Sequence, residues 1–436
     1  MKVGMISLGC SKNQIDSEMI LGMLTKDNFS ITLDQDDADL IIINTCGFID
    51  SAKIEALDEI KRVLNEKKEN QKLIVCGCLA ERYKEFLIKT FPNIDLVISI
   101  HEYPKFGELV SHLFDYNNNL EMSFNNRVLI SSLYTPYVRI ADGCNNNCSF
   151  CAIPLIRGKY VSRDMNDILE EVKLLVLRGA KEINLIAQDT SKYGVDNYHK
   201  LMLTELLENL SKIDGIFLIR LFYIYPETVT DELIECIKTH DNIASYFDIP
   251  LQHASNKILK LMNRHSTKES SLELIKKIKR EISDAVIRTT MMVGFPYETK
   301  KDFFELIEYI KEARFFHMGA FIYSREENTL SYDMKHRVPG FISKKRYDIL
   351  MKTQEKIAKE EKQKLINNIY KCIVDFYDEE SYTYSVRNYM FAPDDVDGEI
   401  VATCPFENDI KLGDIVNVKI IGSEEYDLFG EIIEVL

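Results

Sequence analysis

The chain opens with short apolar runs separated by longer amphipathic stretches. Four runs have the length of strands: VGMISL (3–8), LIIIN (40–44), LIVCG (73–77) and LVISI (96–100). Between them, stretches such as DSAKIEALDEIKRVLNEK (50–67) repeat apolar side chains at helical spacing, as does SEMILGMLTK (17–26). Apolar strands that alternate with helices are typical of a parallel sheet covered on both faces. We therefore predict a doubly wound α/β domain over residues 1–125, ending in a polar linker at YNNNLEMSFNN (116–126).

A second series of strands and helices begins at Tyr137. The strands that it predicts are 137–143, 182–188, 217–224, 246–252, 286–295 and 318–324, with helical stretches such as DILEEVKLLVLRG following them. A closed TIM barrel needs eight such βα units. Six units predict a partial, TIM-like (β/α) barrel over residues 130–360, open on one side where a bulky substrate could enter.

The last part of the chain changes character. A charged helix, QEKIAKEEKQKLINNI (354–369), precedes the short strands KCIVDFY, GEIVAT, DIVNVKIIG and FGEIIEVL, which turns separate. Short strands at this spacing are typical of a small β-barrel. We predict an antiparallel β-barrel over residues 366–436.

Length and composition are those of a soluble protein with several domains. The chain has 436 residues, of which 46% are hydrophobic and 28% charged. No apolar run approaches the roughly 18 residues of a membrane span, and MKVGMISLGCSKNQ lacks the apolar core of a signal peptide. We therefore expect a cytoplasmic protein, in which ten cysteines more often include metal ligands than disulfides.

The negative charge is concentrated in the last domain. Residues 366–436 contain four basic and sixteen acidic side chains, so they carry −12 of the formal net charge of −15. A β-barrel that binds RNA needs a basic groove with aromatic side chains. This barrel would instead repel phosphates and attract a basic protein, although a merely solvated acidic surface would show the same composition.

Cysteines stand at the C-terminal ends of the first three predicted strands. They are Cys10 in SLGC, Cys46 in INTC and Cys78 in CGC. The carboxyl ends of parallel strands share one edge, where open α/β sheets bind ligands. These thiols are thus expected to hold one metal cluster, and the alternative is three core thiols. Cys76 lies inside a strand and is interpreted as a core residue, as are three others: Cys236, Cys372 and Cys404.

A second group, Cys144, Cys148 and Cys151, has the spacing C-x3-C-x2-C in GCNNNCSFC. A structural zinc site needs four ligands, and an ordinary 4Fe–4S ferredoxin also uses four thiolates. No histidine lies near these cysteines in the sequence. Three thiolates on a four-iron cube leave one iron open for another ligand.

This spacing, placed after the first strand of a partial barrel, resembles the signature of radical S-adenosylmethionine (SAM) enzymes. The resemblance implies that Cys144, Cys148 and Cys151 hold a 4Fe–4S cluster. The open iron would chelate the amino and carboxylate groups of SAM, and an electron from the cluster would split the sulfonium to yield a 5′-deoxyadenosyl radical. The resemblance also places Phe150 against the adenine.

A narrower resemblance covers nearly the whole chain. The segments SLGCSKNQIDSE, NTCGFIDSAK, GCLAERY, RIADGCNNNCSFCAIPLIRGKYVSR and DIPLQHAS are similar to those of radical SAM methylthiotransferases. They most resemble the branch that modifies an aspartate of the small-subunit ribosomal protein S-twelve, whose last domain is a TRAM β-barrel. The resemblance implies a second 4Fe–4S cluster on Cys10, Cys46 and Cys78, and no role for Cys76.

In that family the reaction places a methylthio group on the β-carbon of the aspartate and uses two SAM molecules. An electron donor such as flavodoxin or ferredoxin is expected. The enzyme would bind S-twelve either as a free protein or within the small ribosomal subunit. Two alternatives stay open. One is a methylthiotransferase that acts on tRNA adenosine, similar to MiaB. The other is a non-catalytic iron–sulfur protein for electron transfer or sensing.

Further candidates for contact with SAM lie on the barrel strands. Gln188 ends the second strand in LIAQDTSKYG (185–194), where polar side chains usually face the active site. Its neighbours Asp189 and Thr190 are equally suited to a helix cap or a turn. Arg220 lies inside a strand, where a charge needs a partner. A SAM carboxylate or a neighbouring acid would serve.

Two more strand ends complete the set. Gln252 and His253 end the strand in DIPLQHAS, and a lone histidine is more often structural than functional. The family resemblance implies that Met292 and Val293, in MMVGFPYETKKDF (291–303), line the adenine pocket. The family usually has Gly where this chain has Tyr297, and Gly tolerates a positive φ that Tyr does not. The geometry of the turn after Val293 is therefore left open.

Overall fold

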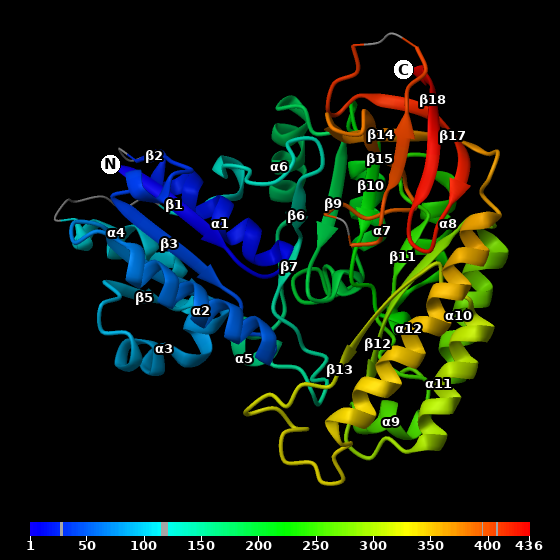
Figure 1. Ribbon diagram of the computed structural model, residues 1–436, viewed down its shortest axis with the longest axis horizontal. Coiled ribbons are helices and arrows are strands. Elements are labelled where there is room, and N and C mark those ends of the chain that lie inside the picture. Colours follow the sequence, from blue (N-terminus) through cyan, green and yellow to red (C-terminus); the bar gives the residue numbers. More distant parts are fainter. Residues whose placement is uncertain (27–28, 115–120, 395, 407–408) are drawn as a thin grey trace. The chain divides into compact units, whose positions relative to one another are not determined.

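The computed structural model describes residues 1–436 except 27–28, 115–120, 395 and 407–408 (Figure 1). The described chain packs as two compact units. Unit 1 comprises Met1–Ser131, Tyr137–Leu174 and Ser324–Tyr332, and unit 2 comprises Ser132–Pro136, Leu175–Tyr323 and Asp333–Leu436. Of the predicted linker over 116–126, residues 116–120 lie outside the described residues, and the rest contains a short 3-10 turn at Phe124–Asn126. The domain boundaries at 1–125, 130–360 and 366–436 stay predictions.

Unit 1 contains the predicted parallel sheet (Figure 1). Its strands are β1 (Lys2–Ser7), β2 (Ser30–Ile31), β3 (Leu40–Thr45), β4 (Lys72–Gly77) and β5 (Leu96–Ile98), in the order β2-β1-β3-β4-β5 with every pair parallel. Successive residues of β3, such as Ile41 and Ile42, belong to two separate core clusters. Both faces of the sheet are therefore buried, which explains its nearly continuous apolar strands. Strand β2 was not predicted because two residues show no periodicity.

The helices of this sheet are α1 (Ser11–Leu24), α2 (Asp50–Glu66), α3 (Cys78–Thr90) and α4 (Phe106–Leu113). Helix α1 begins six residues before the stretch that the apolar pattern predicted. The reason is that its first turns bury polar side chains, among them Asn13, Asp16 and Glu18. A buried polar face leaves no hydrophobic periodicity to detect.

The rest of unit 1 contains the second group of cysteines. The predicted strand 137–143 is divided into β6 (Tyr137–Arg139) and β7 (Ala141–Asp142), and the helices that follow are α5 (Ile153–Arg157) and α6 (Met165–Leu177). Strand β7 pairs antiparallel with β8 (Val161–Ser162). This pair brings the two ends of the intervening loop together.

Unit 2 contains five of the six predicted barrel strands: β9 (Glu182–Ile186), β10 (Leu218–Leu221), β11 (Tyr246–Asp248), β12 (Val286–Val293) and β13 (His317–Ile322). The pairs β9–β10, β11–β12 and β12–β13 are parallel, and a bridge between Ile219 and Ile243 continues the series from β10 towards β11. The helices between and after them are α7 (Leu203–Leu210), α8 (Asp231–Thr239), α9 (Asn256–Leu261), α10 (Lys268–Glu281), α11 (Lys300–Ala313) and α12 (Gly340–Gln363). The predicted alternation of strands and helices in a partial (β/α) barrel is confirmed.

The last strands form a closed barrel, also as predicted. They are β14 (Ile369–Asp378), β15 (Thr383–Arg387), β16 (Ile400–Thr403), β17 (Ile415–Ser423) and β18 (Leu428–Val435), in the order β14-β15-β16-β18-β17. Four pairs are antiparallel, but β16 and β18 are parallel. These two strands are not neighbours in the chain, so no hairpin dictates an antiparallel pairing.

A buried ionic cluster joins this barrel to β9 and β10. The Glu182 carboxylate lies 2.6 Å from Arg387 Nη1 and 2.8 Å from Arg220 Nε. Arg220 also donates to the carbonyl oxygens of Asn388 at 2.9 Å and Tyr389 at 2.7 Å. Each of these buried charges therefore has a partner, as low-dielectric surroundings require.

Within the described chain, no helix is both long enough and apolar enough to cross a bilayer.

Candidate iron–sulfur sites

The structure brings Cys10, Cys46 and Cys78 to one edge of the unit 1 sheet, and we call them the edge set. Cys46 and Cys78 directly follow Thr45 and Gly77, which are partners in the β3–β4 ladder. Cys10 lies just past β1 and caps the N-terminus of α1. A Cβ added to Gly9 would lie 2.7 Å from Cys46 Cβ, so the segment that carries Cys10 is pressed against Cys46.

The thiols of the edge set differ in acidity. Burial raises the pKa of Cys78 to about 12, although the Arg157 guanidinium opposes this shift. Burial also raises the pKa of Cys46. Desolvation acts in the same direction on Cys10, but the Lys12 ammonium and the backbone N–H groups at the start of α1 outweigh it and lower the pKa. A helix N-terminus stabilises a thiolate, the form that binds metal.

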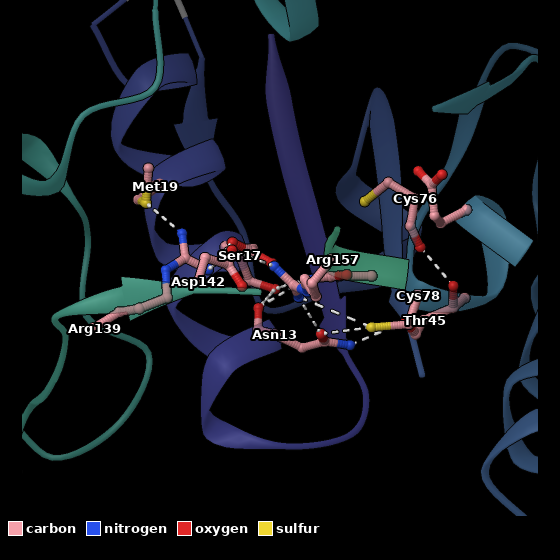
Figure 2. A network of polar contacts seen from close by, with 12 residues as sticks. Asn13, Ser17, Met19, Thr45, Cys76, Cys78, Arg139, Asp142 and Arg157 are labelled. Carbon is pink, nitrogen blue, oxygen red and sulfur yellow. Dashed lines mark hydrogen bonds and ion pairs between the residues drawn. The ribbon is translucent and has the colours of Figure 1, made fainter. Parts of the chain in front are cut away.

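The Asn13 side chain holds the three cysteine-bearing segments together, and Figure 2 shows it beside Thr45 and Cys78. Its Nδ2 donates to the carbonyl oxygens of Leu8 at 3.2 Å and Thr45 at 3.0 Å. Its Oδ1 accepts from the Cys78 thiol at 3.2 Å. Because Asn13 is fully buried, each of these bonds is shielded from water and each lost partner would be costly.

The donor set fits an iron–sulfur cube better than zinc. All ten cysteines lie in the described part of the chain, and none forms a disulfide there. Zinc needs four ligands on a single ion, whereas a cube spreads its thiolates over different irons. The edge set would hold such a cube by three corners.

The other group, Cys144, Cys148 and Cys151, lies in one loop and is called the loop set. Cys144 N donates to Gly158 O at 3.2 Å, which closes the base of the loop. Gly143 has a φ of +72°, and a Cβ there would lie 2.1 Å from Lys159 O. Cys144 and Cys148 are buried, while Cys151 and Phe150 are half-buried. The loop thus presents three thiols on a closed frame.

Unit 1 also packs the edge set against the segment that follows the loop set. Cys78 packs with Ala152 and Ile156 around helix α5. At the end of α5, Arg157 Nη2 lies 2.7 Å from Asp16 Oδ2 and 2.8 Å from Asn13 Oδ1, a contact visible in Figure 2. No sequence pattern predicted a role for Arg157, Asp16 or Asn13. The sequence signal that could have found Arg157 is a charged side chain shortly after the cysteines, in a segment of mostly apolar residues.

A second contact between these parts comes from residues 324–332, which return to unit 1. The buried Glu326 carboxylate lies 2.9 Å from Lys53 Nζ on α2 and 2.8 Å from Arg82 Nη1 on α3. Further along, Ser331 N donates to Ser149 O, inside the loop set, at 2.8 Å. This segment therefore contacts both the sheet helices and the cysteine loop.

The predicted cofactor contacts in unit 2 lie at strand ends, as expected. Gln188 is half-buried just beyond β9, and Val293 is the buried last residue of β12. Gln252 is buried with a φ of +74°, and within the described chain its Oε1 has no hydrogen-bond partner. Asp189 accepts a hydrogen bond from Ser191 Oγ at 2.8 Å at the start of a 3-10 turn, which favours the turn interpretation. Contact of these residues with SAM stays a prediction.

Two other candidates have defined partners. Of the two partners considered for Arg220, the structure supplies the acid, Glu182, and contact of Arg220 with SAM remains untested. His253 Nδ1 accepts from the N–H groups of Ala254 and Ser255, both at 2.9 Å. Burial lowers the pKa of His253 to about 3, so the ring is neutral near pH 7.

The departure at Tyr297 does not abolish the turn. Tyr297 adopts a φ of +67°, the conformation that Gly would favour. Its N–H donates to His336 O at 2.9 Å, and the two rings lie 4.8 Å apart. A non-Gly residue pays roughly 1–2 kcal/mol for this conformation, and these contacts offset part of it.

Comparisons with known proteins agree along the whole chain. Residues 2–99 match the "Uncharacterized protein family UPF0004", residues 138–310 the "Radical SAM superfamily" and residues 366–433 the "TRAM domain". Among solved structures, one similar fold is that of the radical SAM methyltransferase TsrM from Kitasatospora setae, described with cobalamin and a [4Fe-4S] cluster bound. Its TM-score is 0.55 at 13% sequence identity, and the match covers 76% of this chain and 74% of that one. The cobalamin-dependent SAM radical enzyme OxsB has a TM-score of 0.53 at 12% identity, covering 82% and 56%. At such identities these likenesses show the fold alone.

Curated relatives are much more similar. "Ribosomal protein uS12 methylthiotransferase RimO" of Alkaliphilus oremlandii is 43% identical over 99% of both chains. The protein of the same name from Acetivibrio thermocellus is 41% identical over 99% of this chain and 98% of its own length. That from Clostridioides difficile is 43% identical over 99% of both. With its three domain matches and these relatives, the chain belongs to the RimO family of radical SAM methylthiotransferases.

Proposed function

We propose that this chain transfers a methylthio group to the β-carbon of an aspartate in ribosomal protein uS12 (S-twelve). One SAM molecule is split by one electron into methionine and 5′-deoxyadenosyl, which takes the hydrogen from the carbon and becomes 5′-deoxyadenosine. The methyl group comes from a second SAM, which leaves as S-adenosylhomocysteine. The inserted sulfur comes from a separate donor, and a protein such as flavodoxin or ferredoxin supplies the electrons.

The observation that carries this proposal is the presence of two separate sets of three cysteines within one compact unit. As a radical SAM protein, the chain uses a 4Fe–4S cluster and SAM, and we assign that cluster to the loop set. We assign a second 4Fe–4S cluster to the edge set. When bound, the cluster on the loop set would supply the electron that splits SAM. The cluster on the edge set would offer an open iron to the inserted sulfur.

The chain's own residues hold and orient these groups. Phe150 lies between the last two ligands of the loop set and would cover the adenine. In unit 2, Gln188, Gln252 and Val293 provide polar and apolar strand-end contacts for SAM. The orphaned Oε1 of Gln252 suits a ligand donor, because a buried acceptor without a partner is costly.

The charge of the closed β-barrel favours a protein substrate over tRNA. Of its four basic side chains, Arg387 is buried against Glu182, which leaves Lys371, Lys411 and Lys419 at the surface. Of the sixteen acidic residues in 366–436, Asp375 and Asp397 pair with Arg387 and Arg288, and the three lysines are left to balance the charge of the others. Such a surface attracts a basic ribosomal protein and repels a phosphate backbone. Modification of a ribosomal protein, free or in the small subunit, would place the enzyme in the cytoplasm.

Substrate choice is tested by incubating the reconstituted enzyme with uS12 and, separately, with tRNA. A gain in mass for one methylthio group on uS12 is expected, located to an aspartate by fragmentation. Transfer to tRNA alone would contradict the proposal and favour the alternative methylthiotransferase. Two clusters without SAM cleavage under strong reductant would instead favour a non-catalytic iron–sulfur protein.

The cluster assignment is tested with single cysteine variants. Cys151→Ala should lose about half of the bound iron and all SAM cleavage. Cys46→Ala should lose a similar share of iron but keep reductive SAM cleavage while losing methylthio transfer. Cys76→Ala is the matched control, because Cys76 lies in the same sheet but is enclosed in the core. Loss of iron from the Cys76→Ala control, or zinc instead of iron in the purified wild-type protein, would contradict the cluster assignment.

A further inference from the structure

Arg157 is rigidly connected to the loop set. It is the last residue of α5, which begins two residues after Cys151. The next residue, Gly158, accepts the hydrogen bond from Cys144 N that closes the loop. The Arg157 side chain is only 3% exposed. Its position is therefore set by the same frame that presents the loop set.

The guanidinium of Arg157 ends among groups that define the edge set. Its Nη2 lies 2.7 Å from Asp16 Oδ2, 2.8 Å from Asn13 Oδ1 and 3.9 Å from Cys78 Sγ, and Figure 2 shows the last two contacts. Nη2 has two N–H groups for these three acceptors, so the longer bond to sulfur is shared with one of the bonds to oxygen. Because Asn13 also binds the carbonyls of Leu8 and Thr45, Arg157 touches the frame of the whole edge set.

The local charges leave Arg157 available as a cation beside sulfur. Asp16 is shared, since its other oxygen, Oδ1, lies 2.7 Å from Arg139 Nη1. Asp142 completes the cluster at 3.3 Å from Arg157 Nη1, and its side chain is 32% exposed. Two buried guanidinium groups thus share one buried and one partly solvated carboxylate. The Asn13 contact to sulfur uses the thiol as donor, and a sulfur that binds iron has no S–H left to donate. Of the two contacts, the Arg157 N–H can persist.

We propose that Arg157 is a positioning residue that donates a hydrogen bond to Cys78 Sγ and raises the reduction potential of the cluster held by the edge set. This inference rests on the proposed function, which places a cluster there. Reduction adds one electron to the cluster and makes it more negative. A cationic N–H donor at a ligating sulfur stabilises the reduced form, because hydrogen bonds to sulfur and nearby charge set the potential of iron–sulfur centres.

The test uses the full-length protein with both clusters reconstituted. Its midpoint potentials are measured by redox titration with dithionite, followed by electron paramagnetic resonance. Addition of SAM identifies the signal of the loop set, and the other signal belongs to the edge set. Arg157→Gln should shift the edge signal to a more negative potential and leave the loop signal in place. Arg157→Lys keeps the charge but loses the fork of N–H groups, so a smaller shift of the same sign is expected.

Arg163→Gln is the matched control. Arg163 lies in the same unit and is also largely buried, but it pairs with Glu171 at 2.5 Å and with the Arg139 carbonyl at 2.7 Å. No shift of the edge signal is expected from it.

Equal edge potentials in Arg157→Gln and Arg163→Gln would overturn the inference. Should Arg157→Gln fail to retain iron, the absence of any shift in Arg157→Lys would overturn it. A wild-type protein with one cluster would defeat the proposed function as well, whereas two clusters without a shift would defeat this inference alone.

Discussion

The loop set and the edge set present the same number of thiols but are built in opposite ways. The loop set occupies residues 144–151 of one continuous segment. Its shape depends on short-range backbone contacts at Gly143 and Gly158. The edge set comes from three strand ends that lie more than thirty residues apart in the chain. Its shape depends on the sheet register and on buried side chains, above all Asn13.

This difference teaches that two sites of similar chemistry can fail independently. A backbone change in a loop acts on one set of ligands, because the contacts that shape it are local. Removal of a buried polar side chain acts on the other set, because strand ends separated along the chain need long-range contacts to meet. The following variants test this separation.

Gly143→Ala should abolish the loop set. The new Cβ would lie 2.1 Å from Lys159 O at a φ of +72°, and Ala at a positive φ is strained as well. We expect loss of all SAM cleavage and about half of the iron, with the edge set retained. Gly158→Ala is the control, since it also has a φ of +72° but meets nothing within 4 Å. Iron content and SAM cleavage are measured, and equal losses in both variants would show that steric contact is not the cause.

Asn13→Ala should instead empty the edge set. The carbonyls of Leu8 and Thr45 and the Arg157 N–H would each lose a partner. We expect a fall of about 3 kcal/mol in the free energy of unfolding of unit 1 and loss of about half of the iron, while SAM cleavage persists. The control is Asn44→Ala, which removes bonds to Asn13 O and Ser17 Oγ but none to a cysteine. Iron analysis decides: full retention of iron in Asn13→Ala would contradict the role of this side chain.

Glu326→Gln tests the segment that touches both regions. Its loss of charge leaves Lys53 and Arg82 with weaker partners in a buried place, and we expect a local cost of about 2 kcal/mol. Hydrogen exchange should become faster in α2 and α3, with the iron content unchanged. Glu327→Gln is the control, because Glu327 is exposed and bonds to Tyr83 Oη at 3.2 Å. Loss of iron from either set would show that this segment shapes a cluster site.

The smallest effect concerns the metal-free protein. Cys10 is exposed and its pKa is lowered, whereas burial raises the pKa of Cys78 to about 12. The thiolate fraction rises as the pH approaches the pKa from below, so Cys10 begins to react at a lower pH. With iodoacetamide at pH 8, Cys10 should be alkylated at least about tenfold faster than Cys78, since one pKa unit changes the thiolate fraction tenfold. Peptide mass spectrometry measures both rates, and faster labelling of Cys78 would contradict the described burial.

Sequence patterns predicted the main elements well where apolar side chains carried the signal. Strands β3 and β4 were expected within a residue or two of their bounds because both of their faces are buried. The start of α1 was missed because Asn13, Asp16 and Glu18 bury polar groups instead. The partner of Arg220 was left open for the same reason, since only packing places Glu182 beside it. Polar contacts between distant residues have no period in the sequence.

From the amino-acid order alone came the alternation of strands and helices, the cysteine spacing and the strand-end positions of Cys10, Cys46 and Cys78. Each of these follows from local periodicity or from immediate neighbours. Packing alone decided that Asn13 gathers the edge set and that Arg157 reaches Cys78. The physical reason is that a buried hydrogen bond between residues far apart in the chain depends on how the backbone folds back on itself, which no short stretch of sequence specifies.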